Sequence, residues 1–329
     1  MRIVLTRLDR VGDLILSTPA IASVRASWPG AHVTLVCSAY NSVVVAKSRD
    51  IDALAILPAG VKPAAYGKRF RDACDLAIAL APCAPDFALV GATRAPVRVG
   101  YTYVRRYFAR LSAPLYLTKL GISEADPARS DRRPAYRVRH EVAQVLDLVG
   151  LAGGTNLLSE LVVPIDDEDR RAVAGVPGGG IAFHLGARWF RDGSTRASTF
   201  ALVAELRRFG LPIVVTYGVD AAADAAALRA TNLADRVVGE LSFPQWAATF
   251  EKSRLVVTVD TGATHVASAM RRPTVVLFEH RHFHLSSQEW SPYRVPAVCL
   301  RKPASETADA LATTRAEIVA AVDRLVRET

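Results

Sequence analysis

The sequence has no long hydrophobic run and no apolar leader at its start. No stretch approaches the ~18 consecutive apolar residues that a membrane-spanning helix needs. Residues 1–5 are apolar except for one arginine, are too few for a signal peptide, and predict a first strand. We therefore expect a cytosolic protein without a membrane helix.

Cysteine is scarce, and several short catalytic signatures are missing. No two of the four cysteines are spaced as in a structural zinc site, and they lie in apolar stretches or scattered loops, which favours buried free thiols. The chain also lacks a P-loop, a G-x-G-x-x-G turn, and any Ser-His-Asp or Cys-His arrangement with supporting context. The cysteines are Cys37, Cys74, Cys83 and Cys299.

Positive charge is concentrated in the first half of the chain. The formal net charge is +9; residues 1–165 carry 21 Lys and Arg against 13 Asp and Glu, whereas residues 166–329 carry 20 against 19. This imbalance suggests an anionic partner such as a phosphorylated lipid, a membrane surface or nucleic acid, although no nucleic-acid-binding module is present. The alternative is the solvated surface of an arginine-rich protein. Two clusters contribute, the first interleaved with aromatic residues: Arg94, Arg98, Arg105, Arg106 and Arg110, then Arg129, Arg132, Arg133, Arg137 and Arg139.

Short apolar runs alternate with helical patterns along the whole chain. This alternation predicts parallel sheets with helices on both faces. The length of 329 residues and the Gly- and Pro-rich stretch at 175–180 predict two domains with a hinge near residues 165–180. After the first strand, either a helix starts near Asp13 and kinks at Pro19, or Thr18 caps a helix with Pro19 at its first position. The predicted strands are 3–6, 32–37, 53–57, 76–80, 181–184, 213–217, 236–238, 255–259 and 274–278.

A polar turn follows the apolar run at residues 255–259. It contains Asp260, Thr261, Gly262 and His265 and precedes a small-residue helical pattern. A turn between a parallel strand and a helix lies at the carboxyl edge of a sheet, where open α/β sheets bind ligands. Gly262 permits close approach, and the helix start offers free N–H groups to an anion. The turn predicts a site for a polyhydroxylated, phosphate-bearing ligand.

Two separated stretches carry a resemblance to a known family. Residues 7–20 spell R-L-D-R-V-G-D-L-I-L-S-T-P-A, and residues 259–269 spell V-D-T-G-A-T-H-V-A-S-A, followed by R-P-T-V at 272–275. The first resembles a strand ending in R-x-x-x-x-G-D before a T-x-P-A helix, and the second resembles D-T-G-x-x-H-x-A-A. Both patterns are typical of glycosyltransferase family 9, the ADP-heptose:lipopolysaccharide heptosyltransferases. Shorter blocks also fit, so the resemblance covers most of the chain: 74–78, 98–101 and 184–188.

The resemblance implies the GT-B architecture, an α/β fold of two Rossmann-like, doubly wound parallel-sheet domains that face each other across a cleft. We expect an acceptor-binding domain of residues 1–168 and a nucleotide-sugar-binding domain of residues 169–329. The final helix, about residues 313–327, is expected to pack back on the first domain. The implied activity is inverting transfer of a heptose from ADP-heptose to an anionic glycan, the inner core of lipopolysaccharide, with no metal or other cofactor. The implied location is cytoplasmic and peripheral at the inner membrane.

The resemblance also assigns acceptor-side residues. Asp13 matches the family's candidate general base, because an acceptor hydroxyl must lose its proton as the new C–O bond forms. The alternative is a helix N-cap, a position that Asp favours. For His140 the alternative is a helix cap or a surface position, and for the lysines and Arg69 it is a solvated basic run. Arg10 is expected either to hold Asp9 or Asp13 or to contact the acceptor. These expected contacts are Arg10, Gly12, Lys62, Lys68, Arg69 and His140.

On the donor side, the resemblance implies that the polar turn binds the nucleotide sugar. Asp260 would accept hydrogen bonds from sugar hydroxyls, and the amides of Thr261 and Gly262 would face the diphosphate, with His265 beside them. The family has a lysine after its His-x-Gly-Ala loop that this chain lacks. The further expected donor contacts are Arg188 or Arg196 in place of that lysine, Ser194 and Thr195 as hydrogen-bond donors, Asp220 or Asp224 at the ribose, and Leu241 against the base or in the core.

The largest departure from the family lies at residues 279–284, which spell E-H-R-H-F-H where the family usually has Gly-Pro-Thr. Three alternating histidines would share a face of an extended segment, but no matching Cys or Asp trio accompanies them, which favours a polar ligand-facing loop over a metal site. Two alternatives stay open. The changed loop favours the hypothesis of a related transferase that uses another nucleotide sugar, or a protein or small-glycan acceptor. The missing lysine favours the hypothesis of a nucleotide-binding protein without catalytic activity.

Overall fold

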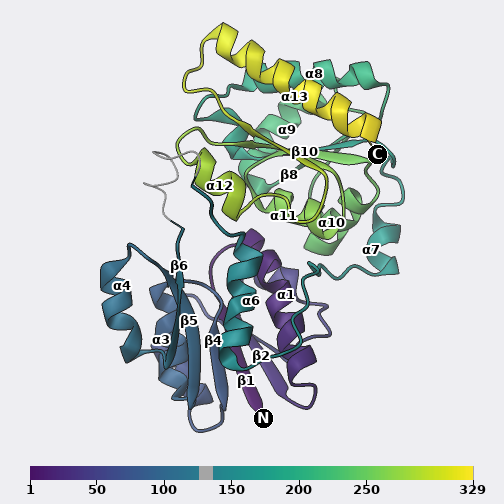
Figure 1. Cartoon of the computed structure of the whole chain (residues 1–329). Helices are drawn as coiled ribbons and strands as arrows, with labels where there is room; N and C mark the ends of the chain where they lie inside the picture. The colour runs from purple at the N-terminus through teal and green to yellow at the C-terminus, as the bar shows by residue number, and fades with distance from the viewer. Residues whose placement is uncertain (126–135, 329) are drawn as a thin grey trace. The chain divides into compact units, whose positions relative to one another are not determined.

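The computed structural model describes residues 1–125 and 136–328, which form two compact units (Figure 1). The first unit spans Met1–Pro164, and the second begins at Ile165, a few residues before the expected boundary. In the part of the chain that the structure describes, no helix combines the length and the apolar character needed to cross a membrane. Three residues of the second arginine cluster lie outside the described residues: Arg129, Arg132 and Arg133.

The first unit is a six-stranded parallel sheet with the strand order β3-β2-β1-β4-β5-β6. The strands β1 and β2 are buried along nearly their whole length, which explains why their sequences are continuous apolar runs. Helices α1 and α6 lie side by side (Figure 1), and α2 packs on α3. The elements are β1 (Arg2–Arg7), α1 (Val11–Ser27), β2 (His32–Ser38), β3 (Ala53–Leu57), α2 (Pro63–Gly67), β4 (Leu76–Ala79), α3 (Ala84–Thr93), β5 (Val97–Tyr103), α4 (Tyr107–Ser112), β6 (Lys119–Ser123) and α6 (Glu141–Ala152).

The second unit is also a six-stranded parallel sheet, with the order β12-β11-β10-β7-β8-β9. The central strands β10 and β11 are buried throughout. The elements are α7 (Asp167–Ala172), β7 (Ile181–Leu185), α8 (Arg196–Leu206), β8 (Ile213–Tyr217), α9 (Ala222–Arg229), β9 (Arg236–Val238), α10 (Phe243–Glu251), β10 (Leu255–Val259), α11 (Gly262–Ala269), β11 (Thr274–Phe278), α12 (Phe283–Glu289), β12 (Ala297–Arg301) and α13 (Ala308–Glu328).

Both sheets have the same strand order when each is counted from its own first strand. That order is 3-2-1-4-5-6, the doubly wound Rossmann arrangement. It confirms the predicted α/β architecture of two Rossmann-like units. The direction of winding reverses between β1 and β4 in the first unit and between β7 and β10 in the second. The carboxyl ends of strands at such a switch point are where open α/β sheets bind ligands.

The first helix starts early and passes through a proline. Helix α1 runs from Val11 to Ser27, so the earlier of the two predicted starts is confirmed and Thr18 does not cap a helix at Pro19. Proline lacks the N–H that would bond the carbonyl four residues before it. The Thr18 hydroxyl donates to that carbonyl, on Ile15, at 2.7 Å, and it accepts a hydrogen bond from the Val162 amide at 2.9 Å. The helix therefore continues with its backbone satisfied.

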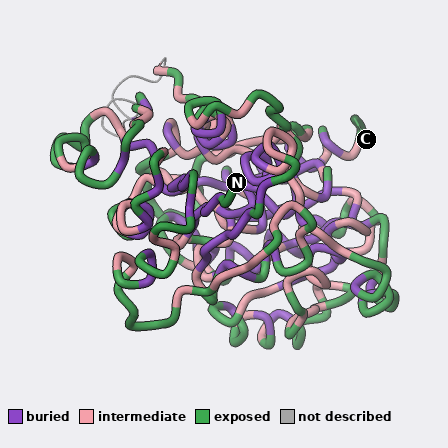
Figure 2. Tube along the Cα trace, turned by 90° about the horizontal axis from the view of Figure 1, so that it is seen from below, coloured by how far each residue is buried: buried purple, intermediate pink, exposed green. Residues whose placement is uncertain are grey.

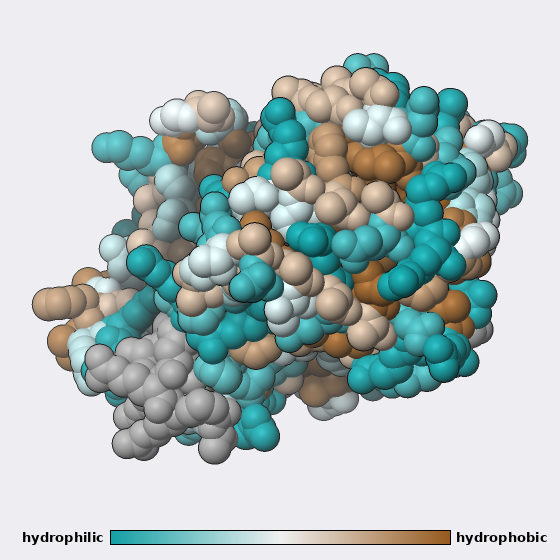
Figure 3. Space-filling model, turned by 90° about the horizontal axis from the view of Figure 1, so that it is seen from above, coloured by the Kyte–Doolittle hydropathy of each residue, from teal (hydrophilic) through white to brown (hydrophobic). Residues whose placement is uncertain are grey.

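Each unit has its own hydrophobic core. Figure 2 shows the buried stretches in purple and the exposed turns in green, and Figure 3 shows surface hydrophobic residues interrupted by hydrophilic ones. The last helix, α13, places Ile318, Val322 and Leu325 in the core of the second unit and contacts α8, β11 and β12. Its buried face is therefore part of the second unit, which corrects the expectation of a helix packed on the first domain.

We expect Thr18→Val to lower the free energy of unfolding by about 1–3 kcal/mol, because the buried Ile15 carbonyl and Val162 amide both lose a partner. Urea unfolding measures the loss. Adding Pro19→Ala supplies a backbone N–H for the Ile15 carbonyl, so the double variant should recover part of it. A Thr18→Val variant as stable as the wild-type protein would contradict this account of how α1 passes its proline.

Candidate functional site

A buried arginine at the end of β1 organises the carboxyl edge of the first sheet. The Arg7 Nε donates to Asp9 Oδ1 at 2.8 Å, and its Nη1 donates to Glu141 Oε1 at 3.0 Å. Its Nη2 lies 3.5 Å from Asp13 Oδ1. The Nη1 also donates to the carbonyl of Leu80, just after β4. The guanidinium thus ties the loop after β1 and the starts of α1 and α6 to the switch point. We call Arg7, Asp9, Asp13 and Glu141 the Arg7 cluster.

Glu141 is held from several directions. Its side chain is buried, and the Tyr101 hydroxyl lies 2.8 Å from each of its carboxylate oxygens. Gln144 Nε2 lies 3.5 Å from Glu141 Oε2. Burial, followed by the negative charge of Glu141 and its hydrogen bond, raises the pKa of Tyr101 well above its usual value. Glu141 therefore acts as a fixed acceptor that holds Arg7 in place.

The Arg7 cluster changes the basicity of Asp13. Burial is the largest effect, and with the neighbouring charges of Asp9 and Glu141 it raises the pKa of Asp13 to about 7, while Arg7 and Arg10 act in the opposite direction. The Asp13 side chain is still 20% exposed, so another molecule can reach it. A general base works best when its pKa is close to the operating pH. Asp13 is therefore suited to take a proton from a hydroxyl group at neutral pH.

Helix starts account for several of the expected acceptor residues. Asp13 lies in the first turn of α1, whose N-cap is Arg10, so the interpretation of Asp13 as an N-cap is wrong. Gly12 is buried in the same turn, and the helix dipole favours the ionised carboxylate there. His140 is the N-cap of α6, and its Nδ1 accepts a hydrogen bond from the Val142 amide at 3.2 Å. His140 thus has the cap position that was the alternative to acceptor binding.

The basic residues expected at the acceptor are not gathered in one place. Lys62 is the exposed N-cap of α2, which follows the carboxyl end of β3. Lys68 and Arg69 come after α2 and are also exposed. Arg69 lines a cavity of about 300 Å³ with residues from the amino ends of β1 and β2. The structure therefore does not bring Arg69 to the sheet edge that holds Asp13.

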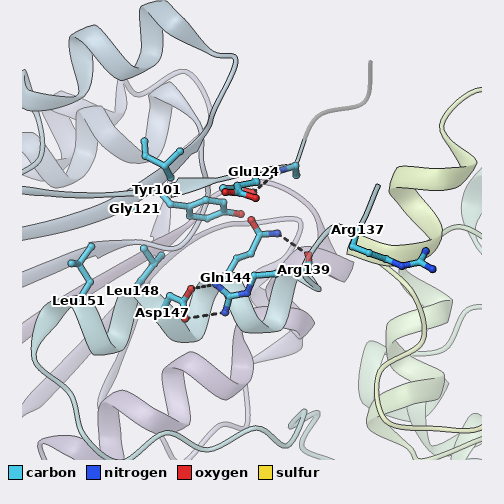
Figure 4. Close-up of a pocket in the computed structure, with 12 residues that line it drawn as sticks. Tyr101, Gly121, Glu124, Arg137, Arg139, Gln144, Asp147, Leu148 and Leu151 are labelled. Carbon is cyan, nitrogen blue, oxygen red and sulfur yellow. Dashed lines mark hydrogen bonds and ion pairs between the residues drawn. The ribbon is translucent and has the colours of Figure 1, made fainter. Parts of the chain in front are cut away.

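A cavity of about 340 Å³ adjoins the Arg7 cluster within the first unit. Figure 4 shows Tyr101 and Gln144 in its wall, from β5 and α6. Both side chains contact Glu141, so they connect the cavity to the cluster. Arg139 and Asp147 form an ion pair at the same cavity, with Nη2 3.1 Å from Oδ1, and the Gln144 amide donates to the Arg139 carbonyl at 3.3 Å.

An ion pair joins the carboxyl ends of β7 and β10 in the second unit. Arg188, in the loop after β7, places its Nη1 3.1 Å from Oδ2 of Asp260, which directly follows β10. Its Nη1 also donates to the backbone carbonyl of Asp260, and its Nε lies 3.8 Å from Glu279 Oε1. All three side chains are partly exposed. The structure therefore brings together two of the residues expected at the donor, with a guanidinium that can meet an anion.

The polar turn after β10 has the expected relation to its helix. Thr261 is the N-cap of α11, and its hydroxyl accepts a hydrogen bond from the Ala263 amide at 3.4 Å. Gly262 is the first helical residue, so the backbone amides at the start of α11 and the positive end of its dipole favour an anion. His265 is buried in the same helix. The turn and the Arg188–Asp260 pair adjoin through Asp260.

Two of the expected acids occupy different positions. The Asp220 carboxylate accepts a hydrogen bond from the Ala187 amide at 3.0 Å, next to Arg188. Asp224 forms an ion pair with Arg196 at the start of α8. Of these two acids, the structure brings only Asp220 into contact with the loop that carries Arg188.

The remaining expected donor residues have clear structural positions. Thr195 is the N-cap of α8, and its hydroxyl accepts a hydrogen bond from the Ser198 amide at 3.1 Å. Ser194 is buried before it. Leu241 packs against a small hydrophobic cluster of the second unit, the core position that was its alternative.

A buried lysine that the sequence did not suggest holds the Arg188 loop. Lys302 directly follows β12, and its Nζ donates to the carbonyls of Arg188 and Arg191 at 2.5 and 2.7 Å. Burial lowers the pKa of Lys302 to about 8. Its own carbonyl lies 3.1 Å from His280 Nδ1. The ammonium thus ties the end of β12 to the loop that presents Arg188.

Residues 279–284 do not form the expected extended segment. The chain turns here and enters α12 at Phe283, with His282 as its N-cap, while His280 contacts the carbonyl of Lys302. His284 lies in the helix, whereas His280 and His282 precede it in a turn, so the three histidines do not share a face of an extended segment and that prediction is wrong. Across residues 1–125 and 136–328, no group of three His, Cys, Asp or Glu is arranged to hold a metal ion.

A family model matches more than half of the sequence. It describes glycosyltransferase family 9 (heptosyltransferase), and the match spans residues 129–319. The chain belongs to glycosyltransferase family 9. It is therefore a glycosyltransferase, as the two sequence motifs predicted. No curated protein matches it in sequence.

Solved structures similar to this family 9 protein share its fold. A glycosyltransferase family 9 protein from Veillonella parvula DSM 2008 superposes with a TM-score of 0.78 at 19% identity, covering 100% of this chain and 98% of that one. E. coli ADP-heptose LPS heptosyltransferase II gives 0.73 at 17% identity, covering 100% and 99%. E. coli heptosyltransferase WaaC with ADP gives 0.66 at 18% identity, covering 98% and 100%. At these identities the likeness concerns the fold, which is GT-B.

Three residues of this family 9 site escaped the sequence analysis. Glu141 had a detectable signal, because it begins the helical stripe that continues with the buried Val145 and Leu148, and an acidic residue on an apolar stripe is unusual. Arg7 appeared only as one letter of a motif, although a charged residue at the end of a buried strand is a similar signal. No sequence signal marks Lys302, because a lysine that follows a strand is normally exposed.

We expect Asp13→Asn to be more stable than the wild-type transferase at neutral and higher pH. The pKa of the folded carboxyl is raised from 3.8 to about 7, so the ionised form opposes folding. The cost is absent below the unfolded pKa and grows between the two pKa values. Above the folded pKa it is complete and amounts to about 4 kcal/mol, at ~1.36 kcal/mol per pKa unit. Urea unfolding at about pH 5 and about pH 8 measures the difference, which should be larger at the higher pH.

Asp9→Asn is the matched control, because it makes the same change in the same loop at a carboxylate bonded directly to the Arg7 Nε. We expect no gain in stability from it. Equal stability of Asp13→Asn and the wild-type protein at both pH values would show that the ionised Asp13 carries no such cost.

Proposed function

We propose that this transferase moves a heptose from ADP-heptose to a hydroxyl of an anionic glycan acceptor, the inner core of lipopolysaccharide, with inversion at the anomeric carbon. The observation that carries the proposal is Asp13, a partly exposed carboxylate with a pKa raised to about 7 at the carboxyl edge of the first sheet. The E. coli WaaC structures with ADP and with ADP-2-deoxy-2-fluoro heptose support the choice of donor. The excess of Lys and Arg in residues 1–165 supports an anionic acceptor.

In the proposed reaction, Asp13 takes the proton of the acceptor hydroxyl as that oxygen attacks the anomeric carbon. The new C–O bond forms while the bond from the anomeric carbon to the diphosphate breaks, and ADP leaves with the electron pair. Attack from the face opposite the leaving group inverts the configuration. Arg7 is a positioning residue, because its bonds to Asp9 and Glu141 fix the guanidinium beside which Asp13 sits.

The proposed donor half of the reaction belongs to the second unit. Negative charge develops on the departing diphosphate, and Arg188 together with the amides at the start of α11 is placed to offset it. Asp260 would accept hydrogen bonds from the sugar and Asp220 from the ribose. Because these groups supply the charge, we propose that the reaction needs no divalent metal or other cofactor.

We propose a cytoplasmic, peripheral location at the inner membrane. The reasoning is chemical: a lipid-linked acceptor is confined to a membrane, whereas a nucleotide-sugar donor is water-soluble. The enzyme must therefore take one substrate from the bilayer surface and the other from solution.

A second candidate function is transfer from a different nucleotide sugar. The segment that begins at Glu279 departs from the family's usual Gly-Pro-Thr, and the Glu279 carboxylate lies 3.8 Å from the guanidinium of Arg188. The changed segment therefore lies beside Arg188, a proposed donor contact, where it can change which nucleotide sugar binds.

Transfer assays with ADP-heptose and with UDP- and GDP-sugars separate these functions. We expect turnover with ADP-heptose that EDTA does not reduce, and a loss of at least about a hundredfold in kcat for Asp13→Asn, because the acceptor proton loses its base. ADP affinity in that variant should stay within about twofold. Asp9→Asn serves as the control and should lose less.

Each outcome decides one point. Turnover with another nucleotide sugar and none with ADP-heptose favours the second candidate. Wild-type turnover in Asp13→Asn removes Asp13 as the base. Donor binding without turnover of any nucleotide sugar makes the chain a non-catalytic binding protein.

A further inference from the structure

Apolar side chains stand exposed along α4 and the turn that follows it. Phe108, Leu111 and Leu115 are 89%, 78% and 78% exposed, and Tyr107 is exposed beside them. The spacing i, i+3, i+7 places the first three on one face of the helical stretch from α4 through residue 115. A surface helix normally turns such a stripe toward the core, so an exposed stripe marks an interaction site.

The stripe is fixed in its outward orientation. Ala113 and Leu117, on the other side of this stretch, are buried in the core cluster of the first unit. Figure 1 places α4 at the left edge of that unit, and Figure 3 shows brown hydrophobic residues at the corresponding edge of the surface. The stretch that carries the exposed apolar face is therefore held in place by the core of the first unit.

Basic residues dominate the stretch of sequence that contains the stripe. Residues 94–123 contain five arginines, one lysine and no Asp or Glu. Arg106 donates to the Pro82 carbonyl at 3.0 Å, and Arg110 donates to the Val104 carbonyl at 3.0 Å. Carbonyl oxygens are neutral partners, so these bonds orient the guanidinium groups without cancelling their charge. The result is an apolar ridge flanked in the sequence by an excess of positive charge, which we call its basic surround.

We propose that α4 and the turn after it form a docking surface for an anionic lipid bilayer. Phe108, Leu111 and Leu115 enter the boundary between headgroups and acyl chains, and the surrounding arginines contact lipid phosphates. A bilayer fits better than a second copy of this chain, because a twofold contact would set the two basic surrounds against each other. The inference deepens the proposed peripheral location by naming the surface that meets the bilayer, and in that respect it rests on the proposed function.

Vesicle sedimentation with the full-length protein tests the proposal. We expect binding to phosphatidylcholine vesicles that contain phosphatidylglycerol, weaker binding to phosphatidylcholine alone, and weakening as salt is raised. The double variant Phe108→Ser, Leu111→Ser should lose about tenfold in partition to anionic vesicles, since two exposed apolar side chains no longer insert. The matched control, Leu157→Ser with Val219→Ser, changes two exposed apolar residues elsewhere and should bind like the wild-type protein.

Thermal unfolding and turnover with a water-soluble acceptor fragment, both unchanged in Phe108→Ser, Leu111→Ser, show that the variant is folded. The proposal is overturned if the wild-type protein does not bind anionic vesicles. It is also overturned if the double variant binds them as well as the control variant does. A loss of self-association in sedimentation velocity, with vesicle binding intact, also overturns it and makes the stripe a contact between copies. If the protein binds anionic vesicles but does not turn over ADP-heptose, the docking surface is supported and the proposed function is contradicted.

Discussion

One buried guanidinium determines the arrangement of the carboxyl edge of the first unit. Burying an arginine is costly unless it is paired and hydrogen-bonded, and Arg7 meets that requirement with Asp9, Glu141 and the Leu80 carbonyl. These partners come from the loop after β1, the start of α6 and the end of β4, so satisfying Arg7 brings the three together. Burial raises the pKa of Asp13 most, and the negative charges of Asp9 and Glu141 raise it further. Arg7 therefore gathers the carboxylates that, together with burial, make Asp13 basic, although its own charge acts in the opposite direction.

The second unit repeats the topology but uses its arginine differently. Arg188 and Asp260 pair across the switch point between β7 and β10, much as Arg7 spans β1 and β4, yet Arg188 stays partly exposed. An exposed guanidinium can meet a ligand, whereas a buried one can only position its neighbours. The positioning role passes to the buried Lys302, which holds the loop of Arg188 through backbone carbonyls. In the proposed reaction, the first edge holds the base and the second receives the anion.

The strands and the loop at Asp260 follow from the sequence because parallel strands buried on both faces are continuous apolar runs, and polar residues after them fall at one edge. The start of α1 was ambiguous, since Pro19 is also a normal first helical residue, and the hydrogen bonds of Thr18 decide it, one of them to a residue 144 positions away. The partnership of Arg7 with Glu141 spans 134 positions. Such pairings depend on tertiary packing, which local pattern does not encode.

The most direct test is a titration of the Asp13 carboxyl by carbon-13 NMR in the wild-type protein and in Glu141→Gln. The Arg7 cluster predicts a pKa of about 7 in the wild-type protein and a lower pKa in the variant, because one neighbouring negative charge has been removed. An ordinary aspartate pKa in the wild-type protein, or a pKa that does not fall in Glu141→Gln, would contradict the view that burial and the neighbouring carboxylates make Asp13 a base.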